Sequence, residues 1–521
     1  METLTTNLTF HILAVQVSTK MKVQKIAIVG GGTSGWLTAA YLTNNLNNPA
    51  EITVIESTKI GPIGVGEGTQ PYTTTFLRAC GLSPREWMPL ADATYKLGVE
   101  FVGWHDKPFF VDNDSIKTHQ VKTNLMTHQA WVGKDPADYF SWLPTYRLAK
   151  NNVSPKLSED LDFVVGSDSV PAEAVHFNAF KIGEALRSLI KDKTTYYDSE
   201  VIKVEQDSNG ITKLILDNNV EVSADLYIDC TGFKSLLIEQ TLGSTHSKVD
   251  VLLPCDNAVT IPTQYKNPKD ECHPYTKSTA MSAGWRWTIP TFNRIGNGYV
   301  YSSKFISKEE AEKELREAIG DFTTPATHLA MKCGYKQEIA IKNVVAVGLS
   351  AGFVEPLEAT GITFTTKTVE MLCHYLNTFE GSLTVNVRQS LNTYFVDMIQ
   401  EIVAFIFLHY KTSSKRDTKF WESFEEASLP FWIRESALQF VPTPPTDLRR
   451  PRKYDMFHSG QWFQMFNACG QYANLSRDTS QEELEYINIY NKMLECRTDL
   501  EIEKFPNHYQ FLKDWYSKLG Q

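Results

Sequence analysis

The sequence predicts an α/β fold organised around a doubly wound, mostly parallel sheet. A short run of β-branched residues, 26–29, is typical of a buried strand and leads directly into Gly30-x-Gly32-x-x-Gly35 and an amphipathic helix. A second apolar run ends at Glu56, 21 residues beyond Gly35. Strand, glycine turn, helix, strand and acid in this order indicate a dinucleotide-binding unit.

The glycines of this turn have separate physical roles. Gly30 permits the tight turn, Gly32 lets a pyrophosphate approach the backbone, and Gly35 lets the helix pack on the strand. The helix N-terminus offers free N–H groups to the phosphates, and Glu56 is expected to hold an adenosine ribose. A glycine turn in an empty α/β domain is the alternative. The residues expected to bind a dinucleotide here are Gly30, Gly32, Thr33, Ser34, Gly35, Trp36 and Glu56.

Two later segments favour FAD over NAD as this dinucleotide. A buried strand ends in Asp229-x-x-Gly232, and a strand over 344–348 leads through Leu349 to a helix from Ile362 to about Tyr375. A third strand–turn–helix of this kind closes an FAD domain around its cofactor, whereas a plain NAD domain does not need one. Further FAD contacts are expected from Gly64, Val65, Gly66, Val201, Asp229, Gly232, Leu349 and Ile362.

Composition excludes several other classes of protein. The net charge of −10 and the lack of a basic stripe argue against nucleic acid as a partner. Eight scattered cysteines show no metal-binding spacing and are typical of reduced thiols in a cytoplasmic protein, so no metal is predicted. The first 20 residues do not form a signal peptide. The longest apolar run, 402–408, is too short to span a membrane, so the protein is expected to be soluble.

The sequence divides into a few regions of different character. Residues 74–80 and 84–97 are expected to be helical, and 98–165 to be an irregular, aromatic-rich insertion that forms a wall of the substrate pocket. The aromatic C-terminal region, including 460–466, is expected to contribute to the same pocket. The predicted organisation is a disordered leader (1–20), an FAD module (21–249 and 335–375, with the insertion 98–165), a β-rich region (250–334) and a helical substrate-pocket region (376–521).

One stretch of the β-rich region connects this sequence to a known family. Gly284-Trp285-Arg286-Trp287-Thr288-Ile289-Pro290 matches the W-x-W-x-I-P signature of the flavin-dependent halogenases of the tryptophan-halogenase type. Other stretches resemble family motifs and occur in the family's order, over residues 22 to about 375: 30–36, 64–69, 229–233, 253–256 and 353–361. The resemblance implies a hydroxylase-like flavoprotein fold with a mixed β substrate region and a largely helical C-terminal region.

The resemblance also implies a reaction. In this family a separate NAD(P)H-dependent flavin reductase delivers reduced FAD, which together with oxygen and a halide gives hypohalous acid. That acid passes through a tunnel and halogenates an electron-rich aromatic ring, indole-like or phenolic, by electrophilic substitution. The resemblance implies that chloride, bromide or iodide binds at Thr360 and Gly361, where N–H groups open a helix.

Three further side chains receive roles from the resemblance. Trp285 and Trp287 are expected to separate flavin from substrate, and Glu358 to polarise hypohalous acid and accept the ring proton. Without the resemblance, the tryptophans would be same-face core, Glu358 a structural or solvated carboxylate, and Thr360 part of an N-capping turn.

The sequence departs from the family at one position. The family has a lysine that positions or covalently carries the activated halogen, expected on the helix after the glycine-rich loop. No lysine occurs between Lys59 and Lys96, and Thr75, or its neighbour Thr74, falls at the expected position. Lys96 lies in another family segment and is predicted to be a poor substitute. The missing lysine leaves three possibilities. Glu358 alone holds hypohalous acid, the enzyme uses the more reactive bromide or iodide, or activity is lost.

Three functions therefore remain open on the sequence. The first is a flavin-dependent halogenase, and the second a flavin-dependent aromatic monooxygenase, which needs neither the tryptophan pair nor the halide turn. The third is an FAD-binding relative that has lost catalysis. The sequence also leaves a homodimer open.

Overall fold

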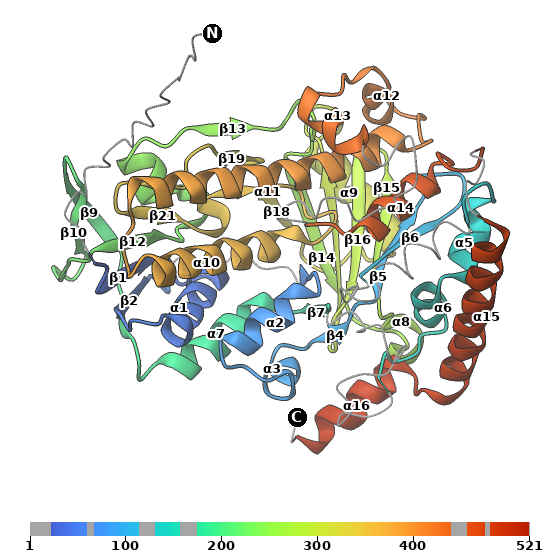
Figure 1. Ribbon diagram of the computed structural model, residues 1–521, viewed down its shortest axis with the longest axis horizontal. Helices are drawn as coiled ribbons and strands as arrows, with labels where there is room; N and C mark the ends of the chain where they lie inside the picture. Colours follow the sequence, from blue (N-terminus) through green and yellow to red (C-terminus); the bar gives the residue numbers. More distant parts are fainter. Residues whose placement is uncertain are drawn as a thin grey trace, which may run out of the picture.

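The computed structural model describes residues 22–59, 67–113, 131–156, 174–438, 456–474 and 480–519 (Figure 1). A six-stranded sheet forms the first half of the molecule, in the order β20-β21-β12-β1-β2-β8. All neighbouring pairs are parallel except β20 with β21. Its strands are β20 (Ala340–Ile341), β21 (Val344–Ala346), β12 (Leu226–Asp229), β1 (Lys25–Val29), β2 (Glu51–Glu56) and β8 (Thr195–Asp198).

Burial explains why β1 is the centre of this sheet. Four of its five residues are buried, and Ile28 pairs with Val54 on one side and Ile228 on the other. A strand covered on both faces is apolar throughout rather than alternating. Helices α1 (Thr33–Asn45), α7 (Ala179–Ile190) and α10 (Thr360–Thr378) pack together beside the sheet. The predicted doubly wound α/β fold is confirmed.

A seven-stranded sheet forms the second half. Its order is β18-β14-β17-β16-β15-β5-β6, and all pairs are antiparallel except β15 with β5. Helix α9 (Lys308–Ile319) packs on β14 and β17. The strands are β18 (Thr327–Ala330), β14 (Asn257–Thr263), β17 (Ile295–Tyr301), β16 (Gly284–Pro290), β15 (Thr276–Met281), β5 (Gly98–Val102) and β6 (Phe109–Asp112).

Two expectations for the region after residue 80 are wrong. The segment 98–165 does not begin as an irregular insertion, because β5 and β6 extend the second sheet and bury Phe101, Phe109 and Phe110 in it. The helix expected over 84–97 ends early, as α3 (Pro84–Leu90), and β4 (Thr94–Tyr95) follows. Asp92 has a positive φ of 52°, which a continuing helix does not allow.

Three small sheets complete the β structure. One of them, β3-β7-β4, lies at the junction of the two halves and brings segments far apart in sequence together. The small sheets consist of β3 (Glu67–Gly68), β7 (Val175–Phe177) and β4; β11 (Glu221–Val222), β10 (Gly210–Leu216) and β9 (Val201–Asp207); and β13 (His246–Lys248), β19 (Gly334–Lys336) and β22 (Gly352–Phe353).

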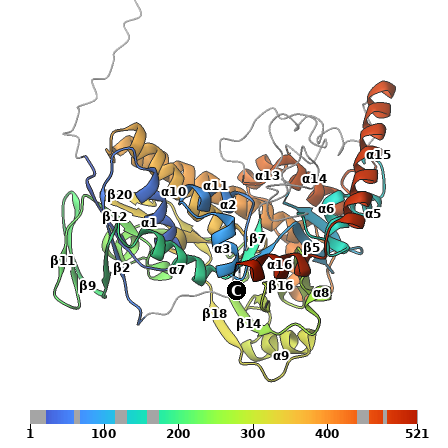
Figure 2. The same cartoon turned by 90° about the horizontal axis from the view of Figure 1, so that it is seen from below.

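The C-terminal part is helical, as predicted. Its long helix α11 (Val385–Thr412) is apolar and long enough to cross a membrane, but 72% of its most apolar window is buried inside the protein, as in a core helix. Helix α15 (Gln481–Lys504) lies at the edge of the molecule and projects from it (Figures 1 and 2). The other helices are α2 (Tyr72–Ala79), α5 (Pro136–Trp142), α6 (Pro144–Lys150), α8 (Pro268–Glu271), α12 (Lys419–Glu426), α13 (Phe431–Leu438), α14 (Ser459–Ala468) and α16 (His508–Lys518).

Candidate active site

A cavity of about 600 Å³ is lined by residues of both large sheets and of helices α1 and α10. From the first sheet come the turn after β1 and the end of β2, and from the second come Trp285, Trp287 and Val300. The site is therefore built at the carboxyl ends of the parallel strands, where open α/β sheets bind their ligands.

The turn between β1 and α1 forms one wall of this cavity. Gly30 has a φ of +110°, and a Cβ there would lie 2.2 Å from the carbonyl oxygen of Cys230. A Cβ on Gly35 would lie 1.9 Å from the Gly30 carbonyl oxygen, so helix and strand touch at this point. At Gly32, by contrast, a Cβ would meet nothing in the described chain within 4 Å and would project into open space at the cavity. This is the cradle that a pyrophosphate needs.

Helix α1 begins at this cradle with its amide groups available. Gly32 is its N-cap, no side chain of the described residues caps the helix there, and its first turn carries no acidic residue. A helix N-terminus with free N–H groups attracts phosphate. The glycine turn and the N-terminus of α1 therefore fit the pyrophosphate of FAD.

The structure places most of the predicted cofactor residues around the cavity. Three of them do not line it: Gly35, Trp36 and Asp229. Gly64, Val65 and Gly66 lie outside the described residues. The predicted residues that do line the cavity are Gly30, Gly32, Thr33, Ser34, Glu56, Val201, Gly232, Leu349 and Ile362.

The placement of Asp229 corrects the sequence prediction. Its completely buried carboxylate accepts hydrogen bonds from the backbone N–H groups of Thr231 (3.0 Å), Leu237 (2.8 Å) and Ile238 (2.9 Å). It therefore shapes the loop that carries Gly232 instead of touching a ligand. Trp36 also lies behind the wall, where its buried ring stacks on Tyr196 at a centroid distance of 6.0 Å.

Glu56 remains at the wall, as predicted. The hydroxyl of Tyr196 donates to its Oε2 at 3.2 Å, and partial burial raises the pKa of the carboxyl. A carboxylate in this position can accept hydrogen bonds from a ribose.

The tryptophan pair forms part of the opposite wall. Trp285 and Trp287 lie on β16 with ring centroids 6.1 Å apart. Trp287 faces Gly298 on the neighbouring strand, where a Cβ would lie 2.0 Å from the indole ring, so the glycine makes room for it. The indole N–H of Trp285 donates to Oε1 of Glu355 at 3.2 Å.

Glu355 is a buried group that the sequence analysis did not single out. It also accepts a hydrogen bond from the Tyr410 hydroxyl at 2.5 Å, and burial raises its pKa to about 7. The carboxyl thus fixes Trp285 from behind and joins β16 to helix α11. Its position within the motif 353–361 was the available signal.

The N-terminus of helix α10 fits a small anion. Thr360 is fully buried, and its Oγ1 has no hydrogen-bond partner among the described residues. Gly361 lines the cavity, and Ala359 at the N-cap has left-handed backbone angles (φ 55°, ψ 40°), a strained conformation typical of functional sites. A halide can be bound by the free N–H groups and the hydroxyl group at the start of a helix. Such donors suit it better than the ammonium group of a lysine, which is strongly hydrated.

The residue predicted at the family's lysine position lies away from the cavity. Thr75 is exposed on α2, and Thr74, although buried, does not line the cavity either. Lys96 lines the cavity instead, is completely buried, and donates from Nζ to the Thr69 carbonyl oxygen at 2.9 Å. The reason is topological: β3 and β4 both pair with β7, and this brings Lys96 beside the segment that follows β3.

Lys96 and Glu358 belong to the same buried site. Burial lowers the pKa of Lys96 to about 8, while the nearby Glu358 carboxylate opposes that shift. Both residues are tied to one segment, because Lys96 binds the carbonyl of Thr69 and Gln70 donates to the Glu358 carbonyl oxygen at 2.7 Å. Glu358 itself does not line the cavity, and neither does Thr360, although Leu357, Ala359 and Gly361 do.

A histidine missed by the sequence analysis completes this group. His409 Nε2 lies 3.2 Å from Oε1 of Glu358, and Nδ1 lies 2.8 Å from the carbonyl oxygen of Phe405. A carbonyl only accepts, so Nδ1 donates to it. His409 Nε2 therefore faces the Glu358 carboxyl group across 3.2 Å without a hydrogen bond between them in this structure. A lone histidine in an apolar helix gave no signal of this role.

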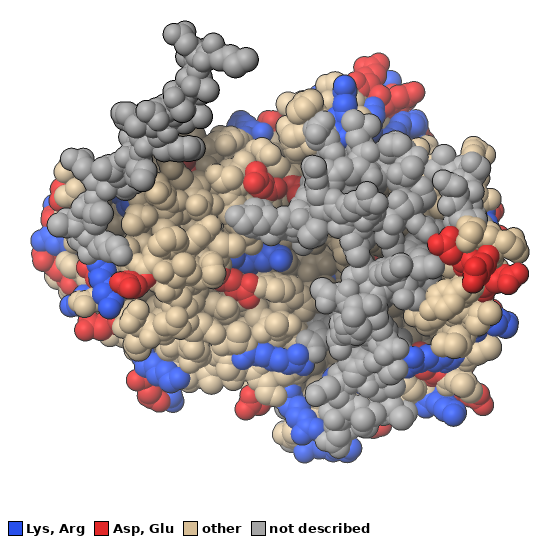
Figure 3. Space-filling model, in the orientation of Figure 1, with Lys and Arg blue, Asp and Glu red and all other residues tan. Residues whose placement is uncertain are grey.

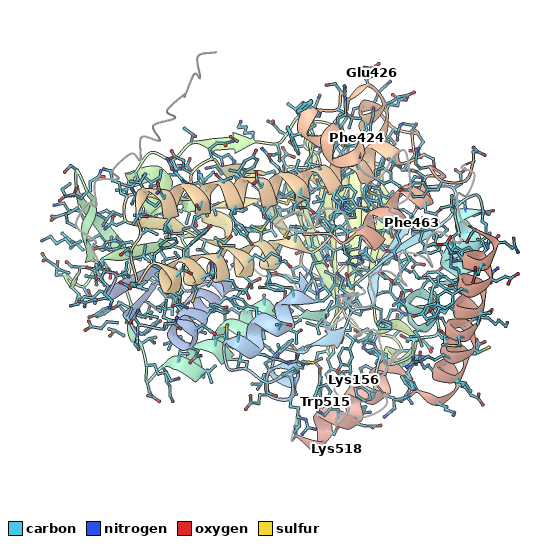
Figure 4. The ribbon with its side chains drawn as sticks, in the orientation of Figure 1. Lys156, Phe424, Glu426, Phe463, Trp515 and Lys518 are labelled. Carbon is cyan, nitrogen blue, oxygen red and sulfur yellow. The ribbon has the colours of Figure 1, made fainter. Side chains whose placement is uncertain are left out.

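Aromatic side chains surround His409 beyond Glu358. The rings of Phe101 and Phe405 lie 4.8 Å from the imidazole, and Trp104 lies 6.4 Å away. The layer continues through the C-terminal helices to Phe424 on α12 and Phe463 on α14, which Figure 4 labels. The predicted pocket segments 98–165 and 460–466 contribute to it, although 114–130 and 157–165 lie outside the described residues.

The fold and this site together define a flavin-dependent oxidoreductase. A family model described as tryptophan halogenase matches residues 25–482. The tryptophan 6-halogenase SttH of Streptomyces toxytricini is 32% identical over 434 residues, covering 79% of this chain and 82% of that protein. The 7-chloro-L-tryptophan 6-halogenase KtzR of a Kutzneria species is 34% identical over 435 residues, covering 79% and 83%.

Solved structures agree with these sequence relationships. The crystal structure of SttH has a TM-score of 0.82 at 28% identity and covers 94% of this chain and 99% of its own. The flavin-dependent halogenase BrvH of a Brevundimonas species has a TM-score of 0.80 at 28% identity, with coverage of 95% and 99%. The chain therefore belongs to the tryptophan halogenase family, and the predicted class, a flavin-dependent halogenase, is confirmed.

Proposed function

We propose that this enzyme halogenates an electron-rich aromatic compound, with Lys96 and Glu358 acting on the halogenating agent. The observation that carries the proposal is the position of Lys96. Its buried ammonium group lies in the wall of the cavity that fits FAD and next to Glu358. When bound, reduced FAD supplies with oxygen the two-electron oxidation that converts a halide into hypohalous acid.

The chain's own residues hold this cofactor and the halide. The N–H groups at the start of α1 would bind the pyrophosphate, and Glu56 would bind the ribose. The backbone around Gly232 and Leu349 would hold the rest of the cofactor. Thr360 and the N–H groups of α10 hold chloride, bromide or iodide. Membership of the tryptophan halogenase family supports a separate NAD(P)H-dependent reductase as the source of the reduced flavin.

Lys96, in the cavity wall, and the neighbouring buried Glu358 then act on hypohalous acid. With a pKa of about 8, Lys96 is mostly protonated at neutral pH and donates a hydrogen bond that positions hypohalous acid. The halogen replaces one ring hydrogen, and the hydroxide that leaves takes a proton from the Lys96 ammonium group to become water. Glu358 accepts the ring proton, and His409 Nε2, 3.2 Å from its Oε1, can take that proton onward.

The tryptophan pair keeps the two reactions apart. Trp285 and Trp287 are almost completely buried in the cavity wall, and Glu355 fixes Trp285 through its indole N–H. We propose that they exclude the aromatic substrate from direct contact with the flavin. The buried lysine beside Glu358 supports an active enzyme over a relative without activity, and no feature of the described residues specifically favours a hydroxylase.

The proposed substrate is an indole, with phenols as the second class. The aromatic layer around His409 supports this choice, as do two relatives named for halogenation of tryptophan and of 7-chloro-L-tryptophan. All eight cysteines lie in described parts of the chain and are free thiols, which supports a reducing, cytoplasmic location.

Mass spectrometry of a panel of indoles and phenols tests the proposed function. Each compound is incubated with the enzyme, FAD, a flavin reductase with NADH, oxygen, catalase and one halide, and free hypohalous acid is trapped as a control. A product mass that changes with the halide supports the proposal. A gain of one oxygen that is independent of halide would identify a monooxygenase and overturn it.

A further inference from the structure

The oxidation of a halide consumes a proton, and the inference drawn from this requirement rests on the function proposed above. When the atoms are balanced, neutral reduced FAD, oxygen, a halide ion and one proton give oxidised FAD, hypohalous acid and water. The same flavin and oxygen can also give hydrogen peroxide, a reaction that takes up no proton. A proton donor in the cavity therefore favours hypohalous acid over hydrogen peroxide.

Three carboxyl groups of the described residues line the cavity: Glu56, Glu67 and Glu200. Two of them have partners. Tyr196 donates to Glu56, the proposed ribose ligand, and the Ser57 hydroxyl lies 3.4 Å from Oε1 of Glu200. No other Asp or Glu of the described residues lines the cavity, and Figure 3 shows many of them on the outer surface.

The other titratable groups of the cavity wall are poorer donors for this step. Lys96 donates to the Thr69 carbonyl oxygen and is assigned to the later step on hypohalous acid. Lys234 is exposed to solvent, and burial raises the pKa of the Cys230 thiol far above its ordinary value. Glu67 is therefore the best candidate.

The carboxyl group of Glu67 has no partner among the described residues, neither a hydrogen bond nor an ion pair. Burial raises its pKa to about 7, and no charged neighbour contributes to this shift. At neutral pH the group is thus present in both protonation states. It can give up a proton and be protonated again by water, as a general acid must.

Glu67 also lies close to the proposed halide site. Together with Gly68 it forms strand β3, which pairs with Phe177 and His176 of β7. A Cβ on Gly68 would lie 3.5 Å from Cβ of Ala359, the N-cap of α10. Strand β3 therefore brings the carboxyl group to the part of the cavity where α10 begins.

We propose that Glu67 donates the proton that is consumed when the halide is oxidised. Reduced FAD and the halide each give two electrons to oxygen. One oxygen atom bonds to the halogen, and the other takes the proton as the O–H bond of Glu67 breaks and leaves as water. Water in the cavity then protonates the carboxylate again. Lys96 and Glu358 act afterwards, on the hypohalous acid.

A single turnover without an aromatic substrate tests the proposal. The FAD-loaded enzyme is reduced and mixed with oxygen and bromide, hypobromous acid is captured by an excess of an organic trap, and hydrogen peroxide is quantified. Glu67→Gln keeps the size of the side chain but has no carboxyl proton to donate. Its ratio of hypobromous acid to peroxide should be at least about tenfold lower than that of wild type, with unchanged FAD affinity. Glu67→Asp, which retains a carboxyl group, should give an intermediate ratio.

Glu200→Gln is the matched control, because Glu200 lines the same cavity beside Ser57. It should give the ratio of the wild type. An unchanged ratio in Glu67→Gln would overturn the proposal. So would weaker FAD binding with an unchanged ratio in the loaded molecules, which would make Glu67 a cofactor ligand. A wild type that forms only peroxide would overturn the proposed function, and this assignment with it.

The protonation of Glu67 can also be measured without turnover. Its pKa is raised from 4.5 to about 7 in the folded chain, so between these values the folded chain binds more protons than the unfolded one. In urea titrations of the full chain without FAD, the free energy of unfolding of wild type should therefore fall relative to that of Glu67→Gln as the pH rises from 4.5 to 7. A constant difference over this range would overturn the assignment.

Discussion

Nε2 of His409 lies 3.2 Å from Oε1 of Glu358, and both side chains are completely shielded from solvent. The two belong to segments about 50 residues apart in the chain, and they meet because α11 lies beside the turn that opens α10. The carboxylate proposed as the acceptor of the ring proton thus has its own partner for that proton.

The first prediction concerns this pair. His409→Phe keeps an aromatic ring between Phe101 and Phe405 but removes the nitrogen that faces Glu358, so kcat for halogenation should fall by about tenfold or more. KM for the aromatic substrate should change little. Steady-state kinetics measure both. An unchanged kcat would remove His409 from the mechanism.

The buried ammonium group of Lys96 should lower the folding stability of the enzyme. Its pKa of about 8 lies below the ordinary 10.5, so the unfolded chain binds more protons between these values. The stability of the wild type should therefore rise as pH increases from 8 to 10.5. Lys96→Met should be more stable than wild type at pH 7, by roughly 1–3 kcal/mol, and the difference should shrink above pH 8.

Urea unfolding of both proteins at several pH values measures this difference. Lys150→Met is a suitable control, because that lysine is 40% exposed and pairs with Glu100 away from the cavity. A difference between wild type and Lys96→Met that stays constant from pH 7 to 10 would contradict the lowered pKa.

The glycine cradle yields a prediction about FAD affinity. Gly32 has an ordinary φ of −69° and its missing Cβ points into open space, so Gly32→Ala should fold normally and bind FAD at least about tenfold more weakly. In Gly30→Ala the Cβ collides with the Cys230 carbonyl, and this variant should lose folding stability as well. Flavin fluorescence titration and thermal unfolding separate the two effects. Equal FAD affinity in wild type and Gly32→Ala would place the pyrophosphate elsewhere.

Removing the hydroxyl group of Thr360 tests the proposed halide site. Thr360→Val keeps the shape of the side chain and removes the unpartnered Oγ1, so KM for halide should rise by about tenfold, as expected for one lost hydrogen bond to an ion. FAD affinity should not change. Thr366→Val removes a hydroxyl that is bonded to the Thr363 carbonyl further along α10, and it should leave the halide KM unaltered. If both variants behave alike, Thr360 does not bind the halide.

The predicted residues that the structure places in the cavity wall come from local patterns. The turn at Gly30 and Gly32, the tryptophan pair and the start of α10 each lie within a few residues of one another, so their pattern is visible in the chain. Asp229 shows the limit of such patterns, because a carboxylate that binds its own loop and one that binds a ligand look the same in sequence.

Residues brought together by distant pairing were not predictable in this way. Lys96 reaches the cavity because β3 and β4 both pair with β7, which lies about 80 residues beyond Lys96 in the chain. The family resemblance directed attention to the helix after the glycine-rich loop, where Thr75 stands, and gave no role to Lys96. His409 depends on the packing of α11 and carries no local motif.

The rate of product formation in three proteins tests the central claim most directly. Wild type, Lys96→Met and Thr75→Val are compared on the best substrate of the panel, with saturating reduced FAD and bromide, and the halogenated product is quantified by mass spectrometry. We expect Thr75→Val to match wild type and Lys96→Met to form no product above background while still binding FAD. An active Lys96→Met, or a Thr75→Val that has lost activity, would contradict the role assigned to Lys96.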